Sequence, residues 1–268
     1  MSPLSPNKHL GIIGCGWLGS SAAQLFIHEN WQVRGTARTA DALKHLEKNN
    51  ISAFRYVLGD SKEKLTSFFS GLDLLIISVP PGLKHQSASD YLIHLSLLGQ
   101  QMQAGLWEHT RVLFVSSTGV YPTSGGPYCE TSQWKTDSEK SDYLLKAEQL
   151  IAQLPFESCV LRLAGLVGKD REPIYTLSKK NNLRGGNLAA NLIHQQDAAR
   201  LLLHLGTLQK LPALVNGVFP QKIKKGIFYT KKAQQLNIAV PQYTDTDLAL
   251  DRHIYSALHL DFKYQNPL

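Results

Sequence analysis

Short apolar runs alternate with longer segments of helical periodicity over the first two thirds of the chain. The runs with the length and composition of buried strands are 10–14, 31–36, 53–57, 73–79, 111–116 and 157–163. The segments with helical periodicity are 18–29, 40–49, 61–69, 87–106, 141–153 and 195–206. This alternation predicts an α/β fold with a doubly wound, mostly parallel sheet that is covered by helices on both faces.

The first predicted strand runs into a turn with the spacing Gly14-x-Gly16-x-x-Gly19, and a predicted helix follows. In a strand–turn–helix context this spacing indicates a Rossmann-type dinucleotide-binding turn, because glycine permits the tight turn, the close approach of a pyrophosphate and the packing of helix against strand. The alternative is an ordinary structural turn. The residues expected to cradle the cofactor here are Gly14, Cys15, Gly16, Trp17, Leu18 and Gly19.

The segment after the second strand indicates which dinucleotide is bound. Binders of NAD and FAD usually carry an acidic residue there, but this chain reads Gly35-Thr36-Ala37-Arg38-Thr39. Arg38 suits a 2′-phosphate because its donors are forked and planar, and Thr36 or Thr39 could add a hydroxyl. We therefore expect NADP(H), with NAD as the alternative. A solvated Arg38 without a ligand is the competing interpretation.

After about residue 165 the alternation breaks down and the chain becomes rich in Lys, Asn, Gln and Gly. We expect residues 1–165 to form the NAD(P)-binding domain, with the segment 195–212 returning to it. Residues 166–268 would then form a small C-terminal lobe on the substrate side. Ligands of such sheets bind at the carboxyl ends of the strands.

The chain has 268 residues and a net charge of +7, which favours anionic ligands. No nucleic-acid motif accompanies the basic residues, so no nucleic-acid partner is expected. A lysine-rich stretch is interpreted first as a solvated face and second as a contact for a phosphate-bearing substrate. Its members are Lys222, Lys224, Lys225, Lys231 and Lys232.

Targeting and metal-binding signals are missing from the sequence. No apolar run has the length of a membrane span, and Met1 to Lys8 has no apolar signal core. Cys15, Cys129 and Cys159 do not have the spacing of metal ligands. We therefore expect a cytoplasmic protein without a metal site or membrane partner.

Several segments, in order, resemble extended short-chain dehydrogenases/reductases. Arg111–Tyr121 reads RVLFVSSTGVY, like the family's Ser-Ser-x-x-Val-Tyr-Gly strand end. Leu161–Gly168 and Asn191–Asp197 resemble later family motifs, and Asp60 resembles the aspartate near the adenine. Ser78, Val79 and Pro80 would pass beside the cofactor. The chain is most similar to the atypical YeeZ-like set of nucleoside-diphosphate-sugar epimerase-like proteins, which implies a bound NAD(P) and a substrate lobe.

The resemblance also implies a catalytic serine, tyrosine and lysine. Ser117 matches the serine, although a serine at a strand end can also cap a turn. The interval from Ser117 makes Tyr143 the acid/base, with Lys146 one position short of the expected lysine. Residues three apart share a helix face, so the two could still converge.

A second alignment of the same helix gives a different result. If Glu148 is matched to the family's Ala-Glu segment, Lys140 takes the place of the tyrosine and Leu144 that of the lysine. Sequence leaves both alignments open. We take Ser117, Tyr143 and Lys146 as the expected catalytic residues and keep Tyr121 and Tyr128 as reserve candidates for the acid/base.

Three functions are consistent with these features. The first is an NAD(P)(H)-dependent oxidoreductase or epimerase/dehydratase that acts on a carbonyl or alcohol, with a nucleotide sugar as one substrate class. The second is a non-catalytic NADP(H)-binding sensor or partner-binding protein. The third is a β-hydroxyacid-type dehydrogenase, which would continue into an all-helical domain. The expected partner is a small-molecule substrate, and a homodimer is left open.

Overall fold

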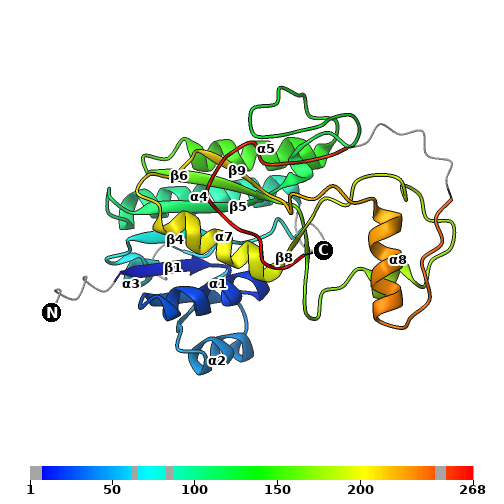
Figure 1. The fold of residues 1–268 in the computed structure, drawn as a ribbon. Coiled ribbons are helices and arrows are strands. Elements are labelled where there is room, and N and C mark those ends of the chain that lie inside the picture. The colour runs from blue at the N-terminus through cyan, green and yellow to red at the C-terminus, as the bar shows by residue number, and fades with distance from the viewer. Residues whose placement is uncertain (1–7, 62–64, 83–86, 245–251, 268) are drawn as a thin grey trace. The chain divides into compact units, whose positions relative to one another are not determined.

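The computed structural model describes residues 8–61, 65–82, 87–244 and 252–267 (Figure 1). Its main feature is a seven-stranded sheet of order β3-β2-β1-β4-β5-β6-β9. The strands are β1 His9–Ile13, β2 Gln32–Ala37, β3 Ser52–Arg55, β4 Leu74–Ile77, β5 Arg111–Ser117, β6 Ser158–Leu163 and β9 Leu214–Gly217. The pairs β1–β2, β1–β4, β2–β3 and β4–β5 are parallel. The predicted doubly wound Rossmann-type sheet is confirmed.

Helices alternate with the strands, as the sequence pattern predicts. They are α1 Trp17–His28, α2 Ala40–Lys48, α3 Thr66–Phe69, α4 Ala88–Gly105, α5 Glu139–Ala152 and α7 Gln195–Thr207. Side chains of α3, α4 and α5 form one apolar cluster with β4 and β5. Phe26 of α1 and Gly206 of α7 are close to each other and to Leu74. Helices therefore cover both faces of the sheet.

The strands β4 and β6 are buried on both faces of the sheet. All four residues of β4 are buried, and only the first residue of β6 is partly exposed. Strands that are apolar on both faces are typical of a parallel sheet between helix layers. β4 therefore reads as a continuous apolar run, and β6 is buried in the same way although it contains the charged Arg162.

The part after residue 165 contains elements that the sequence pattern did not predict. β7 Gly165–Val167 and β8 Leu192–His194 form a separate parallel pair, and α6 Ile174–Leu177 and α8 Lys225–Gln235 are short or polar. β7 and β8 have three residues each, too few to show a period. Their apolar side chains pack with α6 and α8 in a second cluster. In the first part, the predicted helix 61–69 is reduced to α3, and residues 62–64 lie outside the described residues.

The chain divides into two compact units that are interleaved along the sequence. Unit 1 contains 1–116, 142–161 and 199–215, and unit 2 contains 117–141, 162–198 and 216–268. The predicted functional division at residue 165 stays a prediction. Because β6, β7, β8 and β9 all lie in the second half of the chain, the described residues do not form the all-helical second domain of a β-hydroxyacid dehydrogenase.

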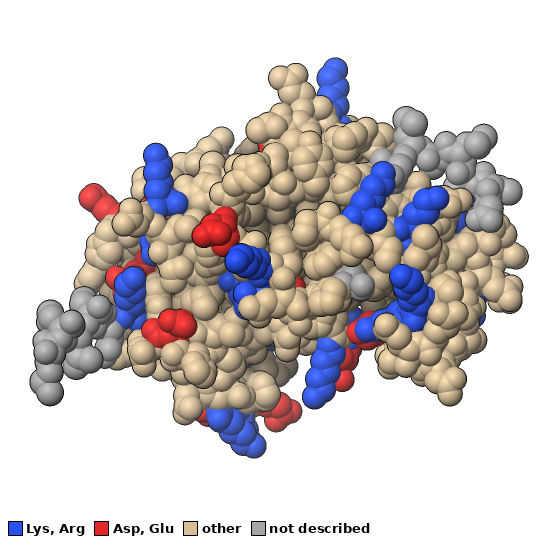
Figure 2. Space-filling view, in the orientation of Figure 1, with Lys and Arg blue, Asp and Glu red and all other residues tan. Residues whose placement is uncertain are grey.

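Two surface features bear on the expected partners. On the visible face, Lys and Arg side chains are separated by other residues and by acidic side chains, without a continuous basic stripe (Figure 2). Lys224 donates to Asn187 and Lys232 pairs with Glu172, so part of the lysine-rich stretch is engaged locally. Within the described residues, no helix has the length and apolar character needed to cross a membrane.

Candidate functional site

The glycine turn after β1 is a close-packed junction within unit 1. Gly14 has φ +84°, a region that non-glycine residues rarely adopt. A Cβ on Gly14 would lie 2.8 Å from the Ser78 carbonyl oxygen and 2.8 Å from Val79 Cγ2. A Cβ on Gly19 would lie 2.9 Å from the Gly14 carbonyl oxygen. Both positions require glycine, the first for conformation and contact and the second for the packing of α1 on the turn.

Gly16 differs from the other two glycines because it faces open space. A Cβ there would meet no atom within 4 Å. Gly16 is also the N-cap of α1, and no side chain caps that helix end. The first N–H groups of a helix and the positive end of its dipole form a site for an anion. The space over Gly16 therefore fits a pyrophosphate group.

Thr36 and Cys15 hold the turn in place and are not directed at a ligand. The Gly14 N–H donates to Thr36 Oγ1 at 2.9 Å, and the Cys15 N–H donates to the Thr36 carbonyl at 2.9 Å. Thr36 is buried. Burial raises the pKa of the Cys15 thiol to about 11, against a smaller opposing effect of Ser20, so the thiol stays protonated at neutral pH. Trp17 and Leu18 continue the turn into α1, with Leu18 buried.

Arg38 lies just after β2 and is exposed. It makes no hydrogen bond or ion pair with any residue that the structure describes. The neighbouring Thr39 is the N-cap of α2, and its hydroxyl accepts from the Ala42 N–H at 3.3 Å. Of the groups expected at a 2′-phosphate, the guanidinium of Arg38 is thus the one not used in local structure.

Asp60 and the segment 78–80 lie at the ends of the next strands. The Asp60 carboxylate accepts from the Val57 N–H at 3.0 Å and closes the turn after β3. The Ser78 N–H donates to the Ile13 carbonyl at 2.8 Å, which places Ser78 and Val79 against Gly14. Pro80 is exposed. All twelve residues expected at the cofactor belong to unit 1, and the glycine turn and Ser78–Val79 are in direct contact.

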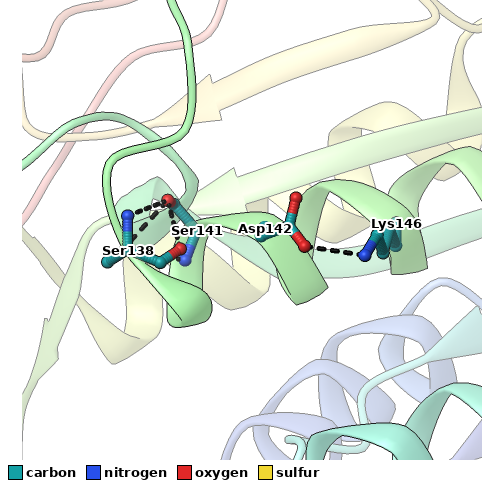
Figure 3. A network of polar contacts seen from close by, with 4 residues as sticks. All are labelled: Ser138, Ser141, Asp142 and Lys146. Atoms are coloured by element: carbon teal, nitrogen blue, oxygen red, sulfur yellow. Dashed lines mark hydrogen bonds and ion pairs between the residues drawn. The ribbon is translucent and has the colours of Figure 1, made fainter.

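Tyr143 and Lys146 lie on α5 but differ in environment. Tyr143 is buried and close to Tyr91, where burial and then the proximity of Tyr143 raise the pKa of Tyr91. Tyr91 in turn donates to the Val79 carbonyl at 3.3 Å. Lys146 is exposed and pairs with Asp142 at 2.7 Å (Figure 3). The structure therefore connects Tyr143 to the cofactor segment through Tyr91, while the ammonium of Lys146 is turned to Asp142.

The start of α5 is fixed by serine hydroxyls (Figure 3). The Ser141 N–H donates to Ser138 Oγ at 3.2 Å, and Ser141 Oγ donates to the Ser138 carbonyl at 2.9 Å. Ser141 is fully buried. These bonds satisfy polar groups at the first turn and set the direction in which α5 begins.

Ser117 is the last residue of β5 and belongs to unit 2. Its hydroxyl accepts from the Gly119 N–H at 3.1 Å, at the start of the short 3₁₀ turn η2, Thr118–Val120. A Cβ on Gly119 would lie 3.3 Å from Ser117 Oγ and 3.3 Å from Lys140 Nζ. The structure thus places Lys140, the residue of the second alignment, beside Ser117 over Gly119.

The reserve tyrosines are part of an aromatic cluster in unit 2. The Tyr121 hydroxyl lies 3.0 Å from both the Cys129 carbonyl and Asn216 Oδ1, and the residue is buried. Its ring stacks on Tyr128, and Arg162 lies over it at 4.9 Å. Burial raises the pKa of Tyr121, against the opposing charge of Arg162. These contacts engage both the hydroxyl and the ring of Tyr121 in the packing of unit 2.

The C-terminal segment 252–266 is fastened along unit 2 by polar side chains, and we call it the C-terminal strap. Asn191 donates to the Arg252 carbonyl at 2.7 Å and accepts from the Ile254 N–H at 2.9 Å. Asp197 accepts from the N–H groups of Gln265 and Asn266 at 3.0 and 2.9 Å. The motif Asn191–Asp197 therefore has a visible role, which the sequence comparison did not reveal.

Cys129, also in unit 2, is expected to titrate near neutrality. Burial raises the pKa of its thiol, but hydrogen bonds from Thr131, Ser132 and Tyr255 outweigh burial and lower the pKa to about 7. An acid with a lowered pKa in the folded state stabilises the fold above its unfolded pKa and loses that effect as the pH falls through the folded pKa. The thiol of an unfolded cysteine has a pKa near 8.5. The free energy of unfolding should therefore decrease as the pH is lowered from about 9 to about 7.

Urea unfolding across this pH range, compared between wild type and Cys129→Ser, measures the effect. The serine variant should lack the thiol-dependent part of the slope. Identical slopes in the two proteins would show that the thiolate is not stabilised in the fold.

The comparisons with known proteins agree with this architecture. No family model matches the chain. YeeZ from Escherichia coli K12 is 26% identical over 274 residues, which cover 97% of this chain and 98% of YeeZ. The structure of MoeE5 in complex with UDP-glucose and NAD matches with a TM-score of 0.76 at 17% identity, over 97% of this chain and 94% of MoeE5.

A second solved structure gives the same result. UDP-N-acetylglucosamine 4-epimerase from Bacillus cereus matches with a TM-score of 0.77 at 12% identity, over 97% of this chain and 92% of that enzyme. Structural likeness at this identity shows a shared fold. The chain is thus similar to YeeZ over its full length and shares the fold of these two proteins.

Proposed function

We propose that the protein is an NAD(P)(H)-dependent oxidoreductase or epimerase/dehydratase-type enzyme that acts on a carbonyl or alcohol, with a nucleotide sugar as the substrate class. The observation that carries the proposal is the open space over Gly16 at the uncapped start of α1, next to the tightly packed Gly14 and Gly19. A ligand pyrophosphate fits this arrangement, since it needs backbone N–H donors and no intervening side chain. The nucleotide-sugar class is suggested by MoeE5 and the Bacillus cereus epimerase.

When bound, the nicotinamide supplies or accepts the hydride. The chain's own residues bind the dinucleotide, orient the substrate and move a proton. The backbone around Gly16 would hold the pyrophosphate. The hydroxyl of Ser117 would hold the reacting oxygen of the substrate, and Tyr143, buried beside Tyr91, remains the proposed acid/base of the first alignment.

NADP(H) is the preferred cofactor in this proposal. Arg38 is exposed, follows β2 and has no partner in the described part of the chain, so its five N–H donors are free to bind a 2′-phosphate. Neither Thr36, which accepts from Gly14, nor Thr39, which caps α2, needs to take part.

Arg38→Ala should weaken NADPH binding by about 10- to 100-fold, because a charge-assisted hydrogen bond contributes roughly 1.5–3 kcal/mol. NADH affinity should be unchanged. Titration of the nicotinamide fluorescence measures both. Lys48→Ala, at the far end of α2, removes the same charge and should leave both affinities unchanged. Equal losses for NADPH and NADH would contradict the assignment of Arg38 to the 2′-phosphate.

A second candidate is a non-catalytic NADP(H)-binding protein. The pairing of Lys146 with Asp142 favours it, because no lysine is then directed to Tyr143 along the helix. Buried Ala147 occupies the position four residues after Tyr143. This candidate predicts tight NADPH binding and no turnover in a screen of nucleotide sugars and small carbonyl compounds. Oxidation of NADPH above the background rate would contradict it.

A further inference from the structure

We propose that Lys140, together with Ser117, binds the reacting oxygen of the substrate and exchanges a proton with it. The inference rests on the proposed function and assigns its proton transfer to Lys140 in place of Tyr143. It uses only contacts within unit 2, which contains Ser117, Gly119 and Lys140.

Lys140 is aligned with the inward face of α5. Leu144, Ala147 and Ile151 follow it at four, seven and eleven residues, and all three are buried. Positions at this spacing form one stripe on a helix. Lys140 lies in the first turn of α5, is exposed, and has no ion pair with any described residue. The inward stripe thus ends in an ammonium group that has reached solvent.

Arg252 of the C-terminal strap fixes the turn that follows Ser117. Arg252 donates through Nη2 to the carbonyls of Thr118 and Tyr121 and so fixes η2 at both ends. Ser117 Oγ accepts from the Gly119 N–H, which leaves its own O–H to donate. The described residues offer that proton no acceptor. Ser117 is therefore oriented as a donor by a turn that is itself fixed.

The absence of a side chain at Gly119 lets the two groups approach closely. Its Cβ position is 3.1 Å from Lys140 Cε and 3.3 Å from both Lys140 Nζ and Ser117 Oγ. The glycine has no positive φ, so its backbone does not require glycine. Both polar tips therefore lie on the same side of Gly119, where a substrate oxygen bound beside the glycine could accept from both.

The chemistry follows from these two donors. In the reductive direction, Lys140 and Ser117 would donate to a carbonyl oxygen, and a bound reduced nicotinamide would supply the hydride to the carbonyl carbon. The carbonyl π pair takes a proton from the Lys140 ammonium, which becomes a neutral amine and regains a proton from water. In the oxidative direction Lys140 would first give its ammonium proton to water and then take the hydroxyl proton, while the bound oxidised nicotinamide would accept the hydride with its electron pair. Donors preorganised at a developing oxyanion are a large term in catalysis.

Lys140→Ala should lower kcat by about 100-fold or more, in the range of general acid–base catalysis, with NADPH affinity unchanged. Small primary amines such as methylamine should restore part of kcat in this variant, which a structural role would not allow. Gly119→Ala should displace both tips and lower kcat by about 10-fold, because the new methyl would lie 3.1 Å from Lys140 Cε. Lys135→Ala, an exposed lysine of the same unit, should behave as wild type. UDP-glucose and UDP-N-acetylglucosamine are the probes.

A second measurement separates this inference from the proposed function. Limited acetylation followed by mass spectrometry reports the accessibility of each lysine. UDP-glucose with NADP⁺ should protect Lys140 several-fold and leave Lys135 unprotected. Protection of Lys140 without turnover by wild type contradicts the proposed enzyme but supports Lys140 as a substrate contact. Wild-type turnover with full activity of Lys140→Ala overturns the inference and leaves the function intact. Neither turnover nor protection overturns both.

Discussion

Gly14→Ala is expected to destabilise the protein by about 3 kcal/mol, from a left-handed backbone cost of roughly 1–2 kcal/mol and an overpacking cost of roughly 1–3 kcal/mol. The backbone cost arises because Gly14 has φ +84°. The overpacking arises because the new methyl would lie 2.8 Å from the Ser78 carbonyl oxygen, a backbone atom that cannot rotate away. NADPH binding should be lost with the turn.

Gly16→Ala is the matched comparison, since it adds the same methyl two residues later. No atom lies within 4 Å of that Cβ, so the stability cost should stay below about 1 kcal/mol, the loss expected for alanine at an N-cap. Its effect on binding should still be large. A methyl in the space of the pyrophosphate should weaken NADPH binding on the order of 100-fold, because it separates the anion from the helix N–H groups.

Urea unfolding and nicotinamide fluorescence, applied to both variants, separate the two roles. Gly14→Ala should fail in both measurements, and Gly16→Ala in binding alone. If Gly16→Ala binds NADPH as wild type does, the open space over Gly16 is not the pyrophosphate site. A stable Gly14→Ala protein would show that the turn can rearrange away from Ser78.

The fold of the first two thirds could be predicted because short apolar runs alternate there with segments of helical periodicity. β4 is buried on both faces, so it appears as a continuous apolar run. β7 and β8 could not be predicted in this way. Each has only three residues. Their apolar side chains pack in a cluster with α6 and α8, and α8 lies more than thirty residues further along the chain.

The glycine turn was also within reach of sequence, because the roles of Gly14 and Gly19 depend on local geometry. The side-chain contacts of α5 were harder to predict. Periodicity alone makes Tyr143 and Lys146 neighbours on α5, but it does not say that Asp142 competes for Lys146. The stripe of Leu144, Ala147 and Ile151 carried a usable signal, since extending it back one turn leads to Lys140. Only the proximity of Lys140 to Gly119 in the structure shows where its ammonium group lies.

Asp197→Ala should lower the free energy of unfolding by about 3 kcal/mol, because it removes two charge-assisted hydrogen bonds worth roughly 1.5–3 kcal/mol each, partly offset by solvation of the released N–H groups. Asp197 is fully buried and accepts from the backbone N–H groups of Gln265 and Asn266. Without the carboxylate, the end of the C-terminal strap should detach.

Because Asp197 binds backbone N–H groups, a side-chain substitution at Gln265 serves as a control. Gln265→Ala keeps the N–H group that Asp197 binds and removes only an exposed side chain, so its stability should stay within about 0.5 kcal/mol of wild type. Asp197→Asn should be intermediate, since an amide presents one acceptor oxygen and one donor nitrogen to two donors. Hydrogen exchange at the amides of Gln265 and Asn266 should accelerate in Asp197→Ala before global unfolding. If exchange there is unchanged while stability falls, Asp197 acts through its other contacts, and the strap is held by Asn191 and its neighbours.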